Sequence, residues 1–276
     1  SRGGGEAVAA GRAGGASPLA ALLARPMEPP LTLSYTMLDT YRRCPRCAFV
    51  RYVLKLPDRA SDETSLGTLV HQILERFYAQ WRAADSEGRP RPGRDELIAL
   101  GRRMWTGALK RHQVARPEER DQLEAQLRGL FDRLHDPEAH ILELERAVRI
   151  QYPRGPHRHT LLCKIDRVDD LGDGRLRLVD YKSGQGWKRL LNPERKDLQL
   201  GLYAMALAQT FNDGRPVGGS AEYWVLQAGQ RGVIALEDLD LEAIQEGINE
   251  SIDGMLGARW ERSAKCQDEV CALLDR

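Results

Sequence analysis

The sequence lacks long apolar runs and lacks an excess of charge of either sign. No stretch reaches the roughly 18 consecutive apolar residues of a membrane-spanning helix, and no signal-peptide core stands near the start of the chain. Lys and Arg number 41 against 40 for Asp and Glu, which gives a formal net charge of +1. This balance excludes a globally basic, histone-like binder, although a local basic face stays possible. We expect no membrane partner.

Cysteine is also scarce, with five residues scattered over 276 positions. An odd and scattered set is not the disulfide framework of a secreted protein, so we expect a reducing, cytoplasmic location. The chain begins at Ser1 rather than at Met. This favours a piece of a longer protein, while a stand-alone protein remains open.

The composition nevertheless allows a substantial core. Hydrophobic residues make up 42% and charged residues 29% of the chain, which excludes wholesale disorder. Residues 1–30 are dominated by Gly, Ala, Pro and Arg, and they predict a flexible linker or arm. We expect order to begin at Leu31 and one domain to span residues 31–276.

Hydrophobic periodicity predicts helices and strands in a mixed order. The expected helices are a short one that follows Ser34 and ends before Pro45, and others over 63–81, about 95–112, about 118–135, about 196–211 and about 240–257. The expected strands cover 142–152, 159–171, 174–184, about 220–227 and about 231–236. This order predicts an α/β fold with a mixed central sheet flanked by helices, and residues 84–140 form a helical insertion.

Two of these strands carry carboxylates at related positions. Side-chain alternation places Asp180 and Lys182 on one face of their strand, and Asp166 projects from the strand before it. If the strands are neighbours across the Gly172–Gly174 turn, the two carboxylates converge and repel each other. A divalent cation such as Mg²⁺ relieves that repulsion, and Lys182 is then placed to stabilise charge on a phosphate.

A plainer interpretation needs no chemistry. In it Asp166 pairs with Arg167 or Lys164, and Asp180 pairs with Lys182. The residues taken alone leave both interpretations open.

Five short motifs in chain order resemble those of the PD-(D/E)XK nuclease superfamily, and specifically its RecB-like branch. That branch includes the exonuclease domains of bacterial helicase–nucleases and the nucleases of CRISPR adaptation. The motifs, which span Leu31 to about Leu207, are LSYTMLDTYRRCP, GTLVHQILERFY, LLCKIDRVDDL, LVDYKSG and QLGLYAMAL. Cys163 stands where the family usually has Gly. The resemblance implies a restriction-endonuclease-like core.

The resemblance also implies site residues. Asp166, Asp180 and the backbone carbonyl of Tyr181 would be metal ligands for Mg²⁺ or Mn²⁺, and Lys182 would be the catalytic lysine. His71 would be a further ligand; its alternative is a satisfied core histidine.

Three more residues are expected to support this site. Glu75 lies one turn beyond His71 and is either a supporting group or a solvated side chain. Gln199 and Tyr203 are four apart and share a helix face. They would hold the site or the DNA backbone, or else pack the helix against the sheet.

Many RecB-like nucleases carry a 4Fe–4S cluster bound by one early and three late cysteines. Cys44 takes the early position, but only Cys266 and Cys271 remain downstream, so Cys47 is the candidate for the fourth ligand. A 4Fe–4S cluster, a structural Zn²⁺ and ordinary thiols all remain open.

Basic residues interleaved with aromatic ones predict a path for single-stranded DNA, with a solvated face as the alternative. The first basic group comprises Arg42, Arg43, Arg46, Arg51, Lys55 and Arg59. A second group comprises Lys188, Arg189, Arg195 and Lys196.

We therefore expect an Mg²⁺- or Mn²⁺-dependent deoxyribonuclease, and an exonuclease in particular, acting in DNA repair, recombination or defence. Its expected partners are DNA with single-stranded character and a helicase domain or subunit. The alternative is a catalytically silent DNA-binding or scaffolding module on the same fold.

Overall fold

The computed structural model describes residues 18–56, 66–110, 119–214 and 216–273. Its helices are α1 (Pro18–Leu23), α2 (Tyr35–Arg43), α3 (Pro45–Ala48), α4 (Leu66–Ser86), α5 (Arg94–Lys110), α6 (Glu119–Arg133), α7 (Leu198–Phe211), α8 (Leu241–Leu256) and α9 (Glu269–Leu273), with short helical turns η1 (Phe49–Val53), η2 (Trp187–Leu191) and η3 (Leu236–Asp238). Its strands are β1 (Thr32–Ser34), β2 (His140–Arg154), β3 (His157–Gly172), β4 (Arg175–Lys182), β5 (Gly219–Val225) and β6 (Gln230–Ala235).

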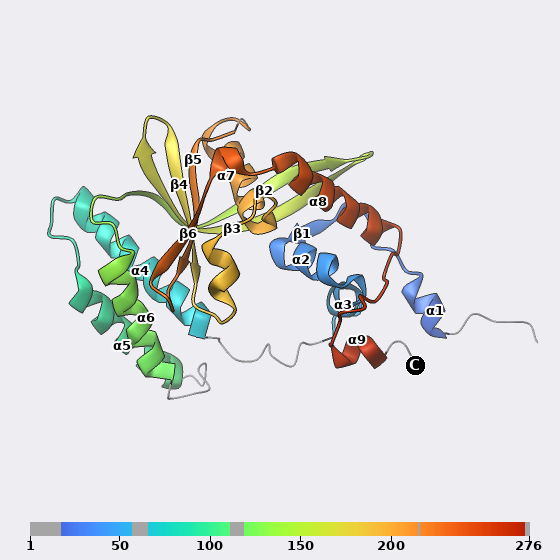
Figure 1. Cartoon of the computed structure of the whole chain (residues 1–276), viewed down its shortest axis with the longest axis horizontal. Coiled ribbons are helices and arrows are strands. Elements are labelled where there is room, and N and C mark those ends of the chain that lie inside the picture. The colour runs from blue at the N-terminus through green and yellow to red at the C-terminus, as the bar shows by residue number, and fades with distance from the viewer. Residues whose placement is uncertain (1–17, 57–65, 111–118, 215, 274–276) are drawn as a thin grey trace, which may run out of the picture.

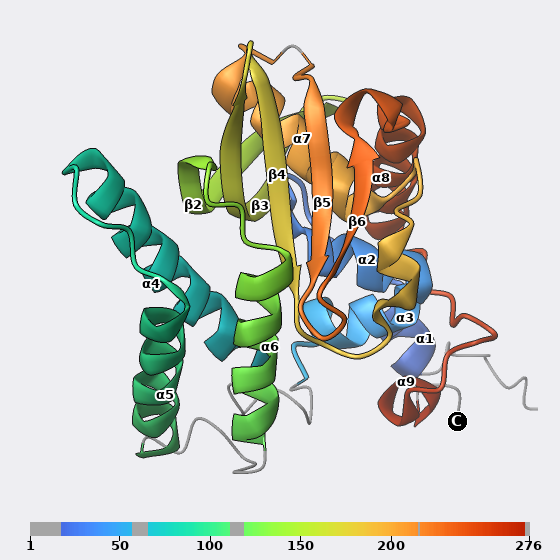
Figure 2. The same cartoon turned by 60° about the vertical axis from the view of Figure 1, so that its left-hand side comes forward.

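Within the described residues the strands form one six-stranded mixed sheet. The strand order is β1-β3-β4-β5-β6. Strand β2 lies outside this order and pairs with β3. The pairs β2–β3, β3–β4 and β5–β6 are antiparallel, whereas β1–β3 and β4–β5 are parallel. The prediction of a mixed α/β fold with a central sheet flanked by helices is confirmed (Figures 1 and 2).

The hairpin between β3 and β4 sets the geometry on which the site depends. Gly172 and Gly174 both have positive φ, 81° and 72°, and they allow the tight reversal that the sequence predicted. The ladder that starts at this turn pairs Arg167 with Val179. Asp166 and Asp180 therefore follow directly beyond this pair, on neighbouring strands.

Each face of the sheet has its own apolar cluster, because successive strand residues point to opposite sides. Val179, Tyr181 and Trp224 pack against α4, α5 and α6 on one face. Leu178 and Tyr223 belong to the cluster that includes α2, α7 and α8 on the other. Figure 2 shows α4, α5 and α6 as a separate layer beside the sheet.

Helix α4 is longer than predicted. Its buried stripe includes the expected Leu69, Ile73 and Phe77, but continues through Trp81 to Ala84. The helix therefore runs on to Ser86, into the segment expected as a loop. The start of the expected helix, residues 63–65, lies outside the described residues.

The expectation of an arm up to residue 30 needs correction for the part that the structure describes. Helix α1 forms, and Met27 packs against the core on α8, where its amide donates to Met255 O at 3.0 Å. Trp260 Nε1 donates to Arg25 O at 2.9 Å. Composition alone underestimated how ordered residues 18–30 are, because a few apolar side chains and two hydrogen bonds to the backbone anchor this segment. Residues 1–17 lie outside the described part.

The C-terminal segment returns to the beginning of the domain. Trp260 contacts the rings of Tyr41 and Phe49, with centroids 5.8 and 5.2 Å apart, and Tyr41 Oη donates to Arg259 O at 2.9 Å. Figure 1 shows α9 beside α3. Two regions far apart in the sequence are thus brought together.

No described helix is long and apolar enough to cross a membrane.

Candidate active site

Asp166 on β3 and Asp180 on β4 are buried, with 6% and 2% of their surface exposed. The Tyr181 amide donates to Asp166 Oδ2 at 2.8 Å, which ties the first carboxylate to the backbone of the second strand. Burial raises the pKa of Asp180 to about 6, and the charge of Asp166 contributes to this rise while Lys182 opposes it. The two carboxylates therefore act on each other, as strand alternation predicted.

Helix α4 brings His71 to the same place. Its Nδ1 lies 3.2 Å from Asp166 Oδ1, and its Nε2 donates to the backbone oxygen of Tyr181 at 3.0 Å. Burial lowers the pKa of His71, but hydrogen bonds to Asp166 and Glu145 raise it by more, to about 10. His71 thus carries its positive charge between the two groups expected to bind a cation.

Glu145 on β2 is a member of this group that the sequence analysis missed. Its Oε1 lies 3.8 Å from His71 Nδ1, and its carboxylate also pairs with Lys164. Ligand atoms of His71, Glu145 and Asp166 all lie within 4.8 Å of one another. The sequence contained a signal for Glu145, because the turn at Gly155 pairs Arg154 with His157. Counting the same number of residues back along β2 and forward along β3 from this pair sets Glu145 opposite Asp166.

A second set of side chains surrounds Asp180 and Lys182. Lys182 Nζ lies 2.6 Å from Asp180 Oδ2 and donates to Gln199 Oε1 at 2.9 Å. Gln199 Nε2 and Tyr203 Oη donate to Asp180 Oδ1 at 2.9 and 3.0 Å. Helix α7 supplies both residues, and Asp197 fixes its start by accepting from the Leu200 amide at 3.0 Å. Gln199 and Tyr203 therefore hold the carboxylate and the lysine directly, rather than only packing the helix.

The plainer ion pairs expected from the sequence are present in part. Asp180 does pair with Lys182. Arg167, by contrast, is fully buried and pairs with Asp169, at 2.6 Å, instead of with Asp166. Lys164 pairs with Glu145. The carboxylate of Asp166 thus contacts His71 and the Tyr181 amide.

The remaining expected residues lie elsewhere. Glu75 is exposed on α4; the hydrogen bond to Glu145 raises the pKa of Lys164, and the charge of Glu75 adds to that rise. Arg43 pairs with Asp39 at 2.6 Å, Arg46 donates to Trp260 O at 3.2 Å, and the guanidinium of Arg42 lies beside α8. These contacts are with α2, α8 and the C-terminal segment. Arg59 lies outside the described residues.

From the second basic group, Arg189 acts on Tyr35, as the acidic residues do. Burial raises the pKa of Tyr35 to about 12, the charges of Asp197 and Asp180 add to the rise, and Arg189 opposes it. Tyr35 and Arg189 are therefore within electrostatic reach of the same site. They offer a ring and a positive charge at its border.

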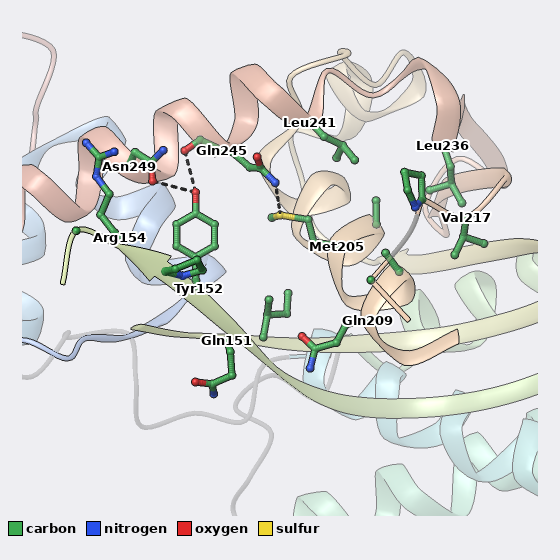
Figure 3. Close-up of a pocket in the computed structure, with 17 residues that line it drawn as sticks. Gln151, Tyr152, Arg154, Met205, Gln209, Val217, Leu236, Leu241, Gln245 and Asn249 are labelled. Carbon is green, nitrogen blue, oxygen red and sulfur yellow. Dashed lines mark hydrogen bonds between the residues drawn. The ribbon is translucent and has the colours of Figure 1, made fainter. Parts of the chain in front are cut away.

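A cavity of about 620 Å³ lies away from these residues, between β2, α7 and α8 (Figure 3). Tyr152 Oη donates there to Gln245 O at 3.1 Å and to Asn249 Oδ1 at 3.0 Å. Its charged lining residue, Arg154, is paired with Asp253. The cavity offers no cluster of titratable groups, so it is not the candidate active site.

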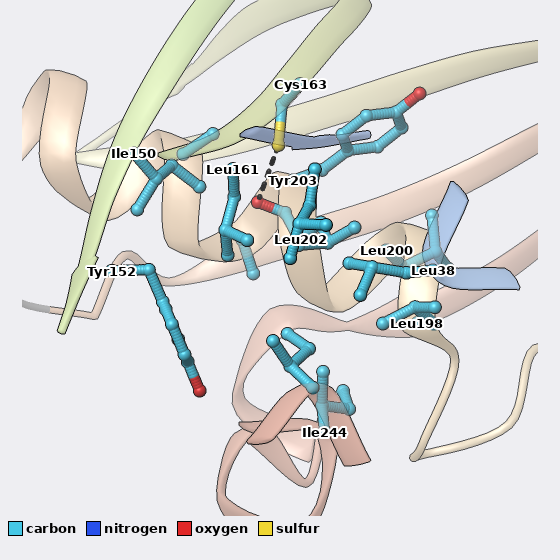
Figure 4. Close-up of a cluster of buried hydrophobic side chains, with 14 of the residues drawn as sticks. Leu38, Ile150, Tyr152, Leu161, Cys163, Leu198, Leu200, Leu202, Tyr203 and Ile244 are labelled. Carbon is cyan, nitrogen blue, oxygen red and sulfur yellow. Dashed lines mark hydrogen bonds between the residues drawn. The ribbon is translucent and has the colours of Figure 1, made fainter. Parts of the chain in front are cut away.

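Four cysteines form a separate group, which we call the four-cysteine cluster: Cys44, Cys47, Cys266 and Cys271. Their sulfur atoms all lie within 4.8 Å of one another. The fifth cysteine, Cys163, is buried in the core with its Sγ 3.7 Å from Leu202 O (Figure 4). It lies on the α7 side of the sheet, in the same apolar cluster as Tyr203, whose hydroxyl donates to Asp180, and it is not part of the four-cysteine cluster.

A family model described as the PD-(D/E)XK nuclease superfamily matches residues 32–276. No curated protein matches the chain. A solved structure entitled "Crystal structure of SSO0001" is similar, at 14% identity and a TM-score of 0.33. The match covers 79% of this chain and 84% of that one.

Proposed function

Because the chain belongs to the PD-(D/E)XK nuclease superfamily, we propose that it is a metal-dependent nuclease that cleaves DNA at the site formed by β3, β4 and α4. The observation that carries this proposal is the convergence of His71, Glu145 and Asp166, whose ligand atoms lie within 4.8 Å of one another. Beside them stands a lysine held in place by hydrogen bonds.

The donor set suits a hard divalent cation. His71, Glu145, Asp166, Asp180 and the Tyr181 carbonyl would hold Mg²⁺ or Mn²⁺, since carboxylate and carbonyl oxygens are the preferred ligands of these ions. Without the ion, the charges of His71 and Lys182 balance the buried carboxylates. When bound, the ion would activate a water molecule and neutralise charge on the phosphate.

Lys182 would stabilise the negative charge that develops on the phosphate. Its ammonium group is fixed by Asp180 Oδ2 at 2.6 Å and Gln199 Oε1 at 2.9 Å. A donor that is already held in place needs little reorganisation during the reaction. Such preorganised groups are the main source of electrostatic catalysis. Asp180 and Gln199 therefore orient the ammonium group of Lys182, which would contact the phosphate.

The finer features of the proposal rest on the RecB-like motifs. They are exonuclease action on DNA with single-stranded ends, a role in DNA repair, recombination or defence, and association with a helicase domain or subunit. The exposed side chains of Lys164 and Arg189 offer positive charge to phosphates, and Tyr35 offers a ring on which a base can stack. For the four-cysteine cluster, the RecB-like motifs imply a 4Fe–4S group.

The silent module is the less favoured function. A nuclease domain that has lost activity is expected to have lost metal ligands or the lysine. Here the ligand side chains converge on one point, and the lysine is ordered beside them.

Cleavage by two single variants tests the proposal. Asp166→Asn removes a ligand charge without changing shape, and Lys182→Ala removes the ammonium group. We expect both to lower Mg²⁺-dependent cleavage of end-labelled single-stranded DNA by roughly 10²-fold or more. Asp170→Asn is the matched control, because Asp170 is exposed on the same strand, and it should cleave like the wild type.

Circular dichroism and thermal unfolding would establish that both variants are folded. If folded Asp166→Asn and Lys182→Ala proteins cleave DNA at the wild-type rate, the proposed site is wrong. If neither they nor the wild type cleaves with Mg²⁺ or Mn²⁺, the silent module is the better account.

A further inference from the structure

The geometry points to a single tetrahedral zinc ion at the four-cysteine cluster, in place of the 4Fe–4S group that the sequence motifs imply. This zinc would be structural, and the inference does not depend on the nuclease activity proposed above. The arguments are the separations of the sulfur atoms, the spacing of the ligands along the chain, and the groups that surround them.

The sulfur atoms are as close together as one ion requires. Cys47 Sγ lies 3.3 Å from Cys266 Sγ, Cys44 Sγ lies 3.8 Å from Cys271 Sγ, and all four lie within 4.8 Å of one another. Zinc binds thiolates at about 2.3 Å, so the sulfur atoms at the corners of a tetrahedron are about 3.8 Å apart. A 4Fe–4S group places four irons and four sulfides between the thiolates and would hold them much farther apart.

The ligand spacing also fits zinc. Cys44 and Cys47 are separated by two residues, and Cys266 and Cys271 by four. Pairs with two to four intervening residues are typical of structural zinc sites. The set comprises two cysteines from each side of the domain, rather than the one early and three late cysteines expected for the iron–sulfur group.

Local structure prepares each half of the site. Cys44 ends α2, and Pro45 begins α3, so the short helix carries Cys47 back beside Cys44. On the other side, Asp268 Oδ1 accepts from the Cys271 amide at 2.7 Å and so orders the start of α9. Cys44, Cys47 and Cys271 thus lie in or at the ends of helices, and Cys266, outside them, is held by its amide, which donates to Ser263 O at 3.0 Å.

The surroundings suit a site with four negative sulfurs. The Ser263 amide donates to Cys44 Sγ at 3.4 Å, a contact that offsets thiolate charge. A cavity of about 570 Å³ reaches the cluster, and Arg43 and Lys265 are among its lining residues. The cavity gives an ion a path of entry, and Lys265 offers positive charge near the excess negative charge of a zinc ion bound by four thiolates, while Arg43 is paired with Asp39.

Zinc here would fasten the two ends of the domain together. The residues joined across the site are 227 positions apart for Cys44 and Cys271 and 219 apart for Cys47 and Cys266. The free energy of binding the ion would stabilise the folded state, because the ligands come together only when the chain is folded. Trp260, packed on Tyr41 and Phe49, belongs to the same junction.

Metal analysis of the full chain, purified without oxygen and without chelators, tests the inference. We expect about one zinc per chain, negligible iron and acid-labile sulfide, and no visible colour. Cys44→Ser and Cys266→Ser should each lose most of the zinc. Two controls should keep it: Cys163→Ser, which changes the core cysteine, and Asp166→Asn, which would lose only a metal bound at the acidic site.

Replacement of the zinc by Co²⁺ gives a second readout, with the strong visible bands of a tetrahedral thiolate site. If the cysteine variants do not fold, a chelator added to the wild type should lower its melting temperature in step with zinc release. Equal amounts of iron and sulfide with brown colour would overturn the inference in favour of 4Fe–4S. A chain that holds no metal, and whose melting temperature the chelator leaves unchanged, would overturn it as well. Both measurements are made without DNA, so the result stands apart from that of the nuclease assay.

Discussion

The catalytic lysine of the proposed site has an aromatic neighbour whose role can be measured. Lys182 Nζ lies 5.1 Å from the ring centre of Tyr223, and Tyr223 Oη donates to Asp197 Oδ1 at 2.9 Å. Asp197 also caps α7, the helix that supplies Gln199. Tyr223 thus touches the lysine through its ring and the start of the helix through its hydroxyl. We interpret it as a residue that positions Lys182.

Two substitutions separate these contacts. Tyr223→Phe keeps the ring and should keep kcat within about twofold of the wild type. Tyr223→Leu removes the ring, and with it a cation–π contact of about 1 kcal/mol, so we expect kcat to fall about fivefold while KM for DNA changes little. Steady-state kinetics of both folded variants checks this. Equal kcat values for the Phe and Leu variants would show that the ring does not position the lysine.

Sequence reasoning reached some of these residues and missed others for reasons of register and distance. Asp166, Asp180 and Lys182 follow from strand alternation next to a glycine turn, which is local information. Glu145 needed the register of the β2–β3 hairpin. Arg42 lies within the first motif and Arg46 directly follows it, but in space they contact α8 and the C-terminal segment, which no local pattern reveals.

At the scale of elements, the position of α7 decides where Gln199 and Tyr203 lie. Gly201, between them, faces α8, and a β-carbon there would stand 2.5 Å from Ile244 Cδ1. The helix pair therefore needs glycine for its close approach. Helix periodicity predicted α7 and α8, but the contact between them depends on tertiary structure.

Gly201→Ala should push α7 away from α8. We expect a loss of about 1–3 kcal/mol in the free energy of unfolding, as for other overpacked sites, together with lower DNA cleavage. Gly129→Ala in α6 is the matched control, because a β-carbon there meets Leu226 O only at 3.8 Å. It should be neutral or stabilise the fold by up to about 1 kcal/mol. Urea unfolding of both variants measures the effect, and equal stabilities would refute it.

The layer formed by α4, α5 and α6 contains a half-buried histidine, His135, that links its stability to pH. His135 follows α6 and stacks on Phe131 with ring centres 4.6 Å apart, and it contacts Tyr78 Oη through Nδ1 at 3.3 Å. Burial, together with the charge of Arg167, lowers the pKa of His135 to about 4. The neutral ring is therefore the form that packs in this layer.

Acidification should destabilise the fold through His135. In the unfolded chain a histidine takes up a proton near pH 6.5, roughly its ordinary pKa, whereas folded His135 does so only near pH 4. Between these values the unfolded state binds more protons, so stability falls as the pH is lowered. His135→Phe should show a smaller drop in melting temperature from about pH 7 to about pH 4.5 than the wild type. His140→Phe, at an exposed site, should behave like the wild type; equal slopes for all three proteins would contradict the assignment.

At the scale of the whole molecule, the proposed site lies where the two sides of the sheet meet. His71 comes from α4, on one face, and Gln199 comes from α7, on the other, while β3 and β4 supply the carboxylates between them. The mixed α/β fold class and the succession of β2 to β6 along the chain could be predicted from periodicity and turns, whereas the three-residue strand β1 and the order of the strands within the sheet were not predicted. The return of the C-terminal segment to α2 and α3 could not, because it depends on contacts such as Trp260 with Phe49, more than 200 residues apart.

The central claim is that this junction binds a divalent cation through His71, Glu145 and Asp166. Anomalous scattering from crystals of the full chain soaked in Mn²⁺ locates such an ion directly. The account predicts a manganese peak in contact with Asp166 and with His71 or Glu145, and its disappearance in Asp166→Asn crystals. A chain that binds manganese elsewhere, or shows no peak at saturating Mn²⁺, would contradict the account.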